Sequence, residues 1–374
     1  MNVVIAGGGT AGHVNPAIAL ARALSKREQG TNEVAFIGTA EGVEASLVPE
    51  AGFPLETVQV HGFDRARPGS LPATGVRAAR AIAQARRALS RLGADVVVGM
   101  GGYVSLPACV AGRALGLPVV LHEQNIVFGL ANRVCRPIAR RTAVSFEATL
   151  ASAGAKGVLT GNPVMPELGD FDRAAERAKG VARFELDPAR RTVLIFGGSQ
   201  GAHTVNQAAI ALGSVWADRD DLQVVHVAGR AAYPRLVAEA ARRHEEHEGQ
   251  LVYRVVEYVD RMVEAYAAAD VALCRGGAST VAELTCAGLP SIIVPYPHHR
   301  DRQQERHAGV LASAGAALVV ADAECTTRLV AEALDRLLAD ERGLAVMSEA
   351  AASLGRPDAA FRLADVVRAA PAGR

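Results

Sequence analysis

The fold is indicated by two glycine-rich segments that each follow an apolar run. The first is Val3-Val4-Ile5-Ala6-Gly7-Gly8-Gly9-Thr10-Ala11-Gly12-His13, and the second is Thr192-Val193-Leu194-Ile195-Phe196-Gly197-Gly198-Ser199-Gln200-Gly201-Ala202. Glycine lets backbone N–H groups approach an anion, and a helix that begins there directs its positive end at the same point. Two such loops predict two similar α/β domains that face each other across a cleft.

Apolar strand-like runs alternate with Ala-rich helical runs, which predicts parallel sheets with crossover helices. Strands are expected at 3–6, 33–37, 96–98, 118–122, 192–196, 223–227, 252–256, 271–274 and 291–294, and helices include 16–26 and 281–287. The pattern breaks at 161–191. We therefore expect one domain over 1–163 and a second over 164–352. The last segment, 353–374, is expected to hold a helix that packs back on the first domain.

Charge is unevenly placed along the 374 residues, although the formal net charge is only +1. Residues 1–163 carry 16 Lys and Arg against 10 Asp and Glu, whereas the rest carries 24 against 29. The first domain is therefore the better candidate for an anionic surface. The five cysteines form no CxxC pair and are expected to be reduced thiols of a cytosolic protein. We expect no secretory signal and no membrane span.

The first loop formally matches the GxGxxG pattern of nicotinamide enzymes through Gly7, Gly9 and Gly12. That pattern also requires an acidic residue at the end of the second strand, where this chain has Gly38-Thr39. A nicotinamide oxidoreductase is therefore disfavoured.

His13 is the candidate base of this loop. We expect Asn15 to cap the following helix and Pro16 to occupy its first turn. His13 then lies just ahead of a helix N-terminus, whose field favours a neutral imidazole that can accept a proton. The alternative is that His13 only forms a hydrogen bond within the loop.

The second half carries three polar strand–loop junctions. Gly198–Gly201 is either a phosphate loop or an ordinary tight turn. Glu283 is either a carboxylate for the ribose hydroxyls of a nucleotide or part of a capping box with Thr280. Gln303 and Gln304 follow a strand end, where ligands bind in open α/β sheets, and amides suit sugar hydroxyls. The alternative for that loop is a solvated helix start capped by Asp301.

No metal site is predicted. Asp218-Arg219-Asp220 matches the DxD pattern of manganese-dependent glycosyltransferases, but it precedes a strand and is interpreted as a solvated turn. His298-His299 lacks metal-ligand spacing and a third ligand.

A basic helix is predicted over residues 76–92. Ile82, Ala85, Leu89 and Leu92 share one face, and the opposite face carries Arg77, Arg80, Arg87 and Arg91. This face is either simply solvated or attracted to anionic lipid, at about 1 kcal/mol per basic residue. Nucleic acid is less favoured because no aromatic residues lie between the arginines.

Taken together, these segments resemble the MurG-type glycosyltransferases of family 28. The matching segments occur in the family's order and span residues 8 to 304: Gly8–Pro16, Gly101-Gly102-Tyr103-Val104-Ser105, His122-Glu123-Gln124-Asn125, Thr160-Gly161-Asn162-Pro163-Val164, Gly197–Ala202, Arg275–Pro290 and Asp301-Arg302-Gln303-Gln304. The ordered set is highly specific, although each loop alone is not. The resemblance implies the GT-B fold, with two facing Rossmann-like domains.

The resemblance also implies a reaction. N-acetylglucosamine would pass from UDP-N-acetylglucosamine to the 4-hydroxyl of a lipid-linked muramyl-pentapeptide, with inversion to a β-linkage and without an obligatory metal or cofactor. The implied donor-binding residues are Ser199, Gln200, Gly201, Val259, Arg275, Glu283, Gln303, Gln304, Thr10, Gly12 and Asn125. Among them Ser199 and its loop hold the diphosphate, Glu283 the ribose, the two glutamines the sugar, the backbone near Val259 reads uracil, and Arg275 helps to stabilise the leaving UDP.

The first domain would bind the acceptor, with its diphosphate near Gly9, Thr10, Gly12, His13, Gly101, Gly102 and Tyr103. The implied catalytic residues are His13, Glu123 and Asn125, and His13 either takes the proton or orients the acceptor phosphate. The resemblance places the enzyme at the cytoplasmic face of the cell membrane, on an anionic surface. It leaves open whether the protein associates with other cell-wall synthesis enzymes.

Three departures from the family pattern stand out. Met165 lies where the family often has an arginine, which puts one donor contact in doubt. The loop before Asp301 is longer, with His298, His299 and Arg300. The expected membrane face is Ala- and Arg-rich rather than strongly apolar, so membrane binding should be released by salt.

Three other functions compete with this interpretation. One is another UDP-sugar enzyme of the same fold, such as a different lipid glycosyltransferase or a 2-epimerase. Another is the nicotinamide enzyme considered above. The third is a non-catalytic nucleotide-sugar-binding or lipid-binding protein.

Overall fold

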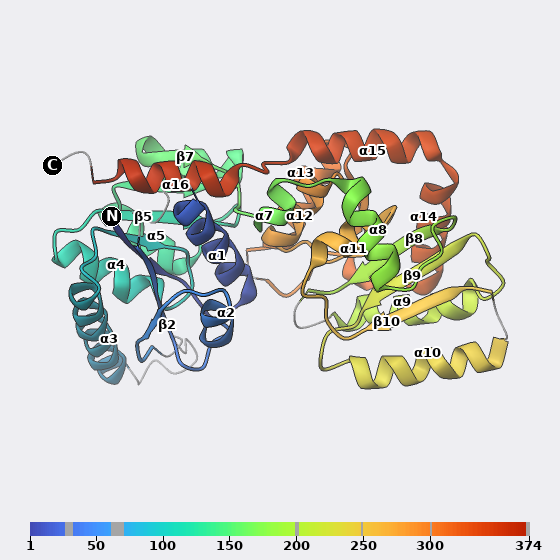
Figure 1. Ribbon diagram of the computed structural model, residues 1–374, viewed down its shortest axis with the longest axis horizontal. Coiled ribbons are helices and arrows are strands. Elements are labelled where there is room, and N and C mark those ends of the chain that lie inside the picture. The colour runs from blue at the N-terminus through green and yellow to red at the C-terminus, as the bar shows by residue number, and fades with distance from the viewer. Residues whose placement is uncertain (27–32, 61–70, 199–201, 248–249, 300, 372–374) are drawn as a thin grey trace. The chain divides into compact units, whose positions relative to one another are not determined.

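The computed structural model describes residues 1–26, 33–60, 71–198, 202–247, 250–299 and 301–371 (Figure 1). The chain divides into two compact units. The N-terminal unit comprises Met1–Pro166 together with Arg356–Arg374, and the C-terminal unit comprises Glu167–Gly355. Each unit holds one parallel sheet with helices on its faces, so the predicted α/β class with two Rossmann-like domains is confirmed.

The N-terminal unit is built on a seven-stranded sheet in the order β3-β2-β1-β4-β5-β6-β7. Its strands are β1 (Asn2–Ala6), β2 (Glu33–Gly38), β3 (Leu55–Thr57), β4 (Val96–Gly99), β5 (Val119–Glu123), β6 (Arg141–Val144) and β7 (Gly157–Leu159). Its helices are α1 (Ala11–Lys26), α2 (Glu44–Glu50), α3 (Leu71–Arg91), α4 (Ser105–Ala114), α5 (Leu130–Cys135), α6 (Leu150–Ala153) and α16 (Ala359–Ala369). The strand order reverses between β1 and β4, and such switch points are where α/β sheets bind ligands.

The C-terminal unit repeats this plan with six strands in the order β10-β9-β8-β11-β12-β13. The strands are β8 (Arg191–Phe196), β9 (Leu222–Val227), β10 (Val252–Val256), β11 (Val271–Cys274), β12 (Ser291–Ile293) and β13 (Ala317–Val319). The helices are α8 (Arg173–Arg183), α9 (His203–Val215), α10 (Tyr233–His247), α11 (Met262–Ala268), α12 (Ala278–Ala287), α13 (Gln303–Ser313), α14 (Thr327–Ala339) and α15 (Glu341–Leu354), and the short α7 (Pro166–Gly169) lies at the unit boundary in sequence. Its switch point lies between β8 and β11.

The core of the N-terminal unit explains why its strands are apolar throughout. Both faces of the sheet are covered, which is the rule for parallel sheets. On one face Leu20 and Leu24 of α1 pack with Leu363 and Val367 of α16. The helix of the last segment thus joins the N-terminal core, and Figure 1 shows α16 lying along α1. On the other face Leu89 of α3 packs with α4 against the sheet.

The basic helix has the faces that its periodicity predicts, within the longer span of α3. Ala85 and Leu89 are buried, and Ile82 and Leu92 are partly buried against the same core. The exposed side chains include Arg77, Arg80, Arg87 and Arg91. Arg91 Nη2 lies 2.7 Å from Glu56 Oε2, so part of the positive charge on this face is neutralised.

The structure corrects the expected start of the first helix. Helix α1 begins at Ala11, so Asn15 and Pro16 lie inside it and Asn15 is not its cap. The carbonyl of Thr10 accepts from the N–H groups of His13 and Val14, which builds the first turn ahead of Pro16. His13 therefore belongs to the first turn of the helix rather than preceding it.

The structure also bears on what the sequence predicts for the cysteines, for metal binding, for membrane spans and for the Asp218–Asp220 segment. All five cysteines are free, and four of them are buried. The described residues contain no cluster of His, Cys, Asp or Glu able to hold a metal ion. None of the described helices is both long enough and apolar enough to span a bilayer. Asp218 and Asp220 are exposed ahead of β9, and the Arg219 between them forms ion pairs with Asp221 and Asp335.

Candidate active site

In the N-terminal unit the loops after β1 and β4 meet at the switch point. Ala6 and Gly99, at the ends of these strands, are paired in register. Gly102 has φ +78°, and a Cβ on it would lie 2.4 Å from the carbonyl oxygen of Gly8. Only glycine allows the two loops to approach this closely. The structure therefore brings together the Gly9–His13 and Gly101–Tyr103 segments that the sequence predicts to share one site.

The His13 side chain is held between these two loops. Its Nδ1 lies 3.1 Å from Thr10 Oγ1. A Cβ on Gly101 would lie 3.0 Å from its Nε2, so the ring packs directly on that glycine. Burial lowers the pKa of His13 below its ordinary value, and the nearby Glu44 charge opposes that shift only in part. The ring is therefore neutral at neutral pH, with one nitrogen able to accept a proton.

Glu44 of α2 holds the first glycine loop, although no local sequence pattern marks it as a site residue. It is fully buried, and its carboxylate accepts from Gly9 N at 2.9 Å, Thr39 N at 2.9 Å and Thr39 Oγ1 at 2.7 Å. Burial raises the pKa of this carboxyl, but the hydrogen bonds from Gly9 and Thr39 outweigh burial and leave it below its ordinary value. The Gly9 amide is thus bonded to an internal carboxylate in this structure.

Glu123 holds the turn that carries Asn125. Its buried carboxylate accepts from four donors: Asn125 N at 3.0 Å, Asn125 Nδ2 at 3.1 Å, Gly129 N at 3.0 Å and Asn132 Nδ2 at 2.9 Å. Burial raises its pKa, and these bonds oppose the rise. With so many bonds made inside the unit, Glu123 orients Asn125, which is only half-buried.

The neighbours of Glu123 tie three strand ends together. Gln124 Nε2 donates to Met100 O at 2.7 Å, after β4, and His122 Nε2 lies 3.0 Å from Gly161 O, after β7. His122 Nδ1 and Gln124 Oε1 are buried and have no partner among the described residues. The His122–Asn125 segment therefore acts as a brace across the carboxyl edge of the sheet.

In the C-terminal unit Glu283 lies on α12, after the switch strand β11. It accepts from the hydroxyl of Tyr266 at 2.6 Å. Burial raises its pKa to about 7, and the Tyr266 bond opposes that rise. The capping-box alternative is wrong, because α12 begins at Ala278 after Gly277 and has no side-chain cap. Glu283 is thus a carboxyl poised near neutrality.

Arg275 is buried at the end of β11 and turned toward its own unit. Its Nη1 donates to Val294 O at 3.1 Å and forms an ion pair with Asp322. Asp322 also accepts from Thr204 Oγ1, in the first turn of α9, at 3.2 Å. Asp322, which no sequence motif marks, therefore links the loop after β11 to the helix that follows the glycine loop after β8.

Gln304 fastens two loops of the same unit. Its Oε1 accepts from Gly276 N at 3.1 Å and from Tyr296 N at 2.9 Å.

Arg302, just before α13, has φ +47°, a conformation that is costly for a residue with a Cβ. No side chain caps α13, so the alternative in which Asp301 caps this helix is wrong.

The remaining donor residues fall into two groups. Val259 is buried between β10 and α11, and Gln303 is half-buried in the first turn of α13. Ser199, Gln200 and Gly201 lie outside the described residues. The glycine before them, Gly198, has φ +87°.

Comparisons with known proteins agree with this geometry. The family 28 glycosyltransferase N-terminal domain matches residues 3–144, and the family 28 C-terminal domain matches residues 192–363. A protein of a Nocardioides species named UDP-N-acetylglucosamine--N-acetylmuramyl-(pentapeptide) pyrophosphoryl-undecaprenol N-acetylglucosamine transferase is 45% identical, over 98% of this chain and 97% of its own. A protein of the same name from Acidothermus cellulolyticus is 40% identical over 100% and 99%.

Solved structures give the same result for the fold. MurG of Acinetobacter baumannii matches with a TM-score of 0.75 and 27% identity, over 98% of this chain and 99% of that one. A UDP-GlcNAc 2-epimerase from Neisseria meningitidis shares the fold at a TM-score of 0.69 but only 13% identity, over 98% and 100%. Because both domain models and full-length relatives match, the chain belongs to glycosyltransferase family 28, with the GT-B fold.

Proposed function

We infer that this protein is a hexosyltransferase that moves N-acetylglucosamine from UDP-N-acetylglucosamine to the 4-hydroxyl of the muramyl sugar in undecaprenyl-pyrophosphoryl-N-acetylmuramyl-pentapeptide. The product carries a β-1,4 linkage and serves peptidoglycan synthesis. The observation that carries this proposal is full-length identity of 40–45% to transferases of that name. The neutral His13 at the switch point of the N-terminal unit supports it.

The C-terminal unit is proposed to bind the donor. The Glu283 carboxylate accepts hydrogen bonds from the ribose hydroxyls, and Gln303 contacts the sugar. Gln304 contributes its amide nitrogen, because its oxygen already serves Gly276 and Tyr296. Ser199 and its neighbours bind the diphosphate in this scheme. Arg275, paired with Asp322, acts by fixing the loop after β11 rather than by direct contact with the leaving group.

The N-terminal unit is proposed to bind the acceptor. Its diphosphate faces Gly101, Gly102 and Tyr103, because the Gly9 amide already donates to Glu44. His13 removes the proton of the acceptor 4-hydroxyl as that oxygen attacks the anomeric carbon. The bond from that carbon to the UDP oxygen breaks, and single displacement inverts the α-linkage to β. Asn125, oriented by Glu123, contacts the donor sugar.

The enzyme is proposed to act at the cytoplasmic face of the membrane, held there by the basic face of α3. The exposed arginines of that face support attraction to anionic lipid. We expect protein bound to vesicles that contain phosphatidylglycerol to be released between 0.1 and 0.5 M salt, because screening weakens exposed charges. Retention at high salt would show that apolar insertion dominates instead.

The transferase proposal is tested by UDP release from UDP-N-acetylglucosamine, with and without a short-chain lipid-linked muramyl-pentapeptide. We expect release that depends on the acceptor, together with a product heavier by one N-acetylhexosamine. Epimerisation of the donor without acceptor would instead support a 2-epimerase. Binding of UDP without any turnover would support a non-catalytic binding protein.

A further inference from the structure

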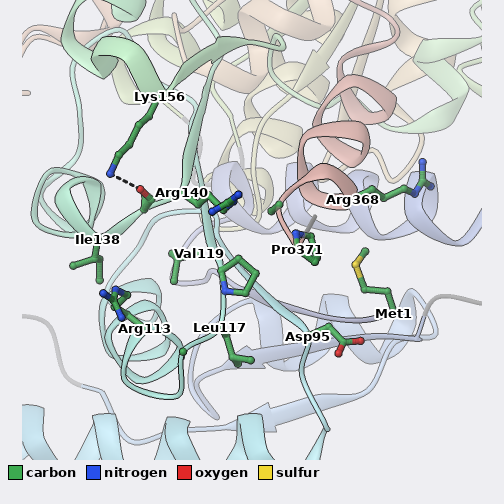
Figure 2. Close-up of a pocket in the computed structure, with 14 residues that line it drawn as sticks. Met1, Asp95, Arg113, Leu117, Val119, Ile138, Arg140, Lys156, Arg368 and Pro371 are labelled. Carbon is green, nitrogen blue, oxygen red and sulfur yellow. Dashed lines mark hydrogen bonds between the residues drawn. The ribbon is translucent and has the colours of Figure 1, made fainter. Parts of the chain in front are cut away.

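A large pocket lies at the edge of the N-terminal sheet opposite to the candidate site. It measures about 900 Å³, and its lining includes the residues just before four strands: Met1 before β1, Asp95 before β4, Pro118 before β5 and Arg140 before β6 (Figure 2). The candidate site lies at the carboxyl ends of the same strands. At about 3.3 Å per residue, strands of this length separate the two places by more than 10 Å. The pocket is therefore a separate feature, which the transferase reaction does not use.

Positive charge dominates this pocket. Its lining contains Arg113 at the end of α4, Arg140, Lys156 and Arg368 of α16, against the single acidic residue Asp95. Asp95 is already engaged, since its Oδ2 accepts from Asn2 N at 2.8 Å. The cations come from separate elements, so the excess of charge is a property of the folded unit and not of one basic stretch of sequence.

Of the four cations of this pocket, Arg368 forms an ion pair with Asp365 at 3.3 Å, and the other three have no ion pair among the described residues. Arg113 and Arg140 are exposed, and neither has a carboxylate within ion-pair distance among the described residues. Lys156 Nζ donates to the carbonyls of Pro137 at 3.1 Å and Ala139 at 2.7 Å, which fixes it on the wall without neutralising it (Figure 2). An anion placed in the pocket would meet the charges of Arg113, Arg140 and Lys156, which no acid of the described residues neutralises.

The rest of the lining is apolar. Leu117, Val119 and Ile138 form part of the wall, and Figure 2 shows Val119 between the side chains of Arg113 and Arg140, with Ile138 beside Arg113. The pocket is also larger than an inorganic phosphate requires, and its volume suits a ligand of drug size. The positive charges and the apolar lining together favour a ligand that has an anionic group attached to an apolar part.

We propose that this pocket is a second binding site, for a phosphate ester whose phosphate is held by Arg113, Arg140 and Lys156 and whose apolar part lies against Leu117, Val119 and Ile138. Arginine is suited to this role because its planar fork of N–H groups matches phosphate oxygens. The phosphate ester can be the headgroup region of an anionic phospholipid or a soluble phosphate compound. Both have the same chemistry at the arginines.

The test measures binding of three soluble probes to the full-length protein by calorimetry: dihexanoyl-phosphatidylglycerol below its micelle concentration, glycerol 3-phosphate and dihexanoyl-phosphatidylcholine. The variants are Arg113→Gln and Arg140→Gln, both at exposed positions where the fold should tolerate the change. The matched control is Arg362→Gln, an exposed arginine of α16 that does not line the pocket. Thermal unfolding verifies that each variant is folded.

We expect dihexanoyl-phosphatidylglycerol to bind, and each pocket variant to weaken its Kd about tenfold, equivalent to about 1.4 kcal/mol. Arg362→Gln should bind as the wild type does. Weaker binding of glycerol 3-phosphate would assign the site to a lipid, whereas equal binding would assign it to a soluble phosphate ester. Absence of binding by both phosphate probes, unchanged affinity in both pocket variants, or equal binding of the phosphatidylcholine probe would overturn the proposal.

Discussion

Replacement of Glu44 by alanine should loosen the loop that carries His13. The carboxylate of Glu44 is fully buried and accepts three hydrogen bonds, one from Gly9 N and two from Thr39. A hydrogen bond to a charged group contributes about 1.5–3 kcal/mol, and a buried donor left without a partner costs about 1–3 kcal/mol. The variant no longer has to bury a charge, and water can reach part of the space. We therefore expect a net loss of about 3 kcal/mol.

Two companion variants make this measurement specific. Glu44→Gln keeps the shape but directs an amide NH₂ toward a donor, so an intermediate loss of about 1–2 kcal/mol is expected. Glu50→Ala, an exposed position on the same helix, should change stability by less than about 0.5 kcal/mol. Because the chain has two units, hydrogen exchange of peptides that cover residues 1–26 is preferable to one global unfolding curve.

The pH dependence of this exchange provides a second signature. The folded pKa of Glu44 lies below its ordinary value of 4.5, so its contribution to stability is present above that pH and is lost as pH falls through the folded pKa. After correction for the intrinsic exchange rate at each pH, the protection of amides near Gly9 should fall on acidification in the wild type, and Glu44→Gln should lack that component. Equal protection of residues 7–14 in Glu44→Ala and Glu50→Ala would refute the reasoning.

Three further predictions concern turnover, donor binding and stability. His13→Ala should lower acceptor-dependent UDP release at least about 100-fold while donor affinity, measured by calorimetry, stays within about twofold. Because the pKa of Glu283 is raised to about 7 and the ribose requires the carboxylate, the donor KM should fall as pH rises through 7, and Glu283→Gln should flatten that profile. Asp322→Ala leaves the Arg275 guanidinium buried without its carboxylate, so it should destabilise the C-terminal unit by about 3 kcal/mol in urea unfolding.

The central strands of both units were predictable because they are buried on both faces and are rich in Val, Ile and Leu. The strands that were missed lie toward the two edges of the N-terminal sheet. They are β3, β6 and β7, of only three or four residues each, and β6 begins with the polar pair Arg141-Thr142. Such strands form by pairing with a neighbour already in place, so their own sequence holds little periodic signal.

The glycine loops of the candidate site could be predicted from the sequence. The side chains that hold these loops in place could not. His13, Glu283 and the glutamines stand next to strand ends in the sequence. Glu44 and Asp322 reach their partners only through the fold, since Glu44 is 35 residues from Gly9 and Asp322 is 47 residues from Arg275. A lone acidic residue at the start of a helix is usually exposed to solvent. No local sequence pattern therefore distinguishes Glu44 and Asp322 from such residues.

The two glycine loops open similar units but are chemically different. A nucleotide diphosphate bound in the usual way would lie close to the middle glycine of GxGxxG, here Gly9. That position already faces the Glu44 carboxylate, whose depressed pKa keeps it negative at neutral pH. A diphosphate there would meet like charge and would lose the Gly9 amide, which opposes nucleotide binding in the N-terminal unit. Titration with UDP should therefore saturate at one equivalent per chain. A second equivalent bound with similar affinity would show that a phosphate can replace the Glu44 carboxylate at the Gly9 amide.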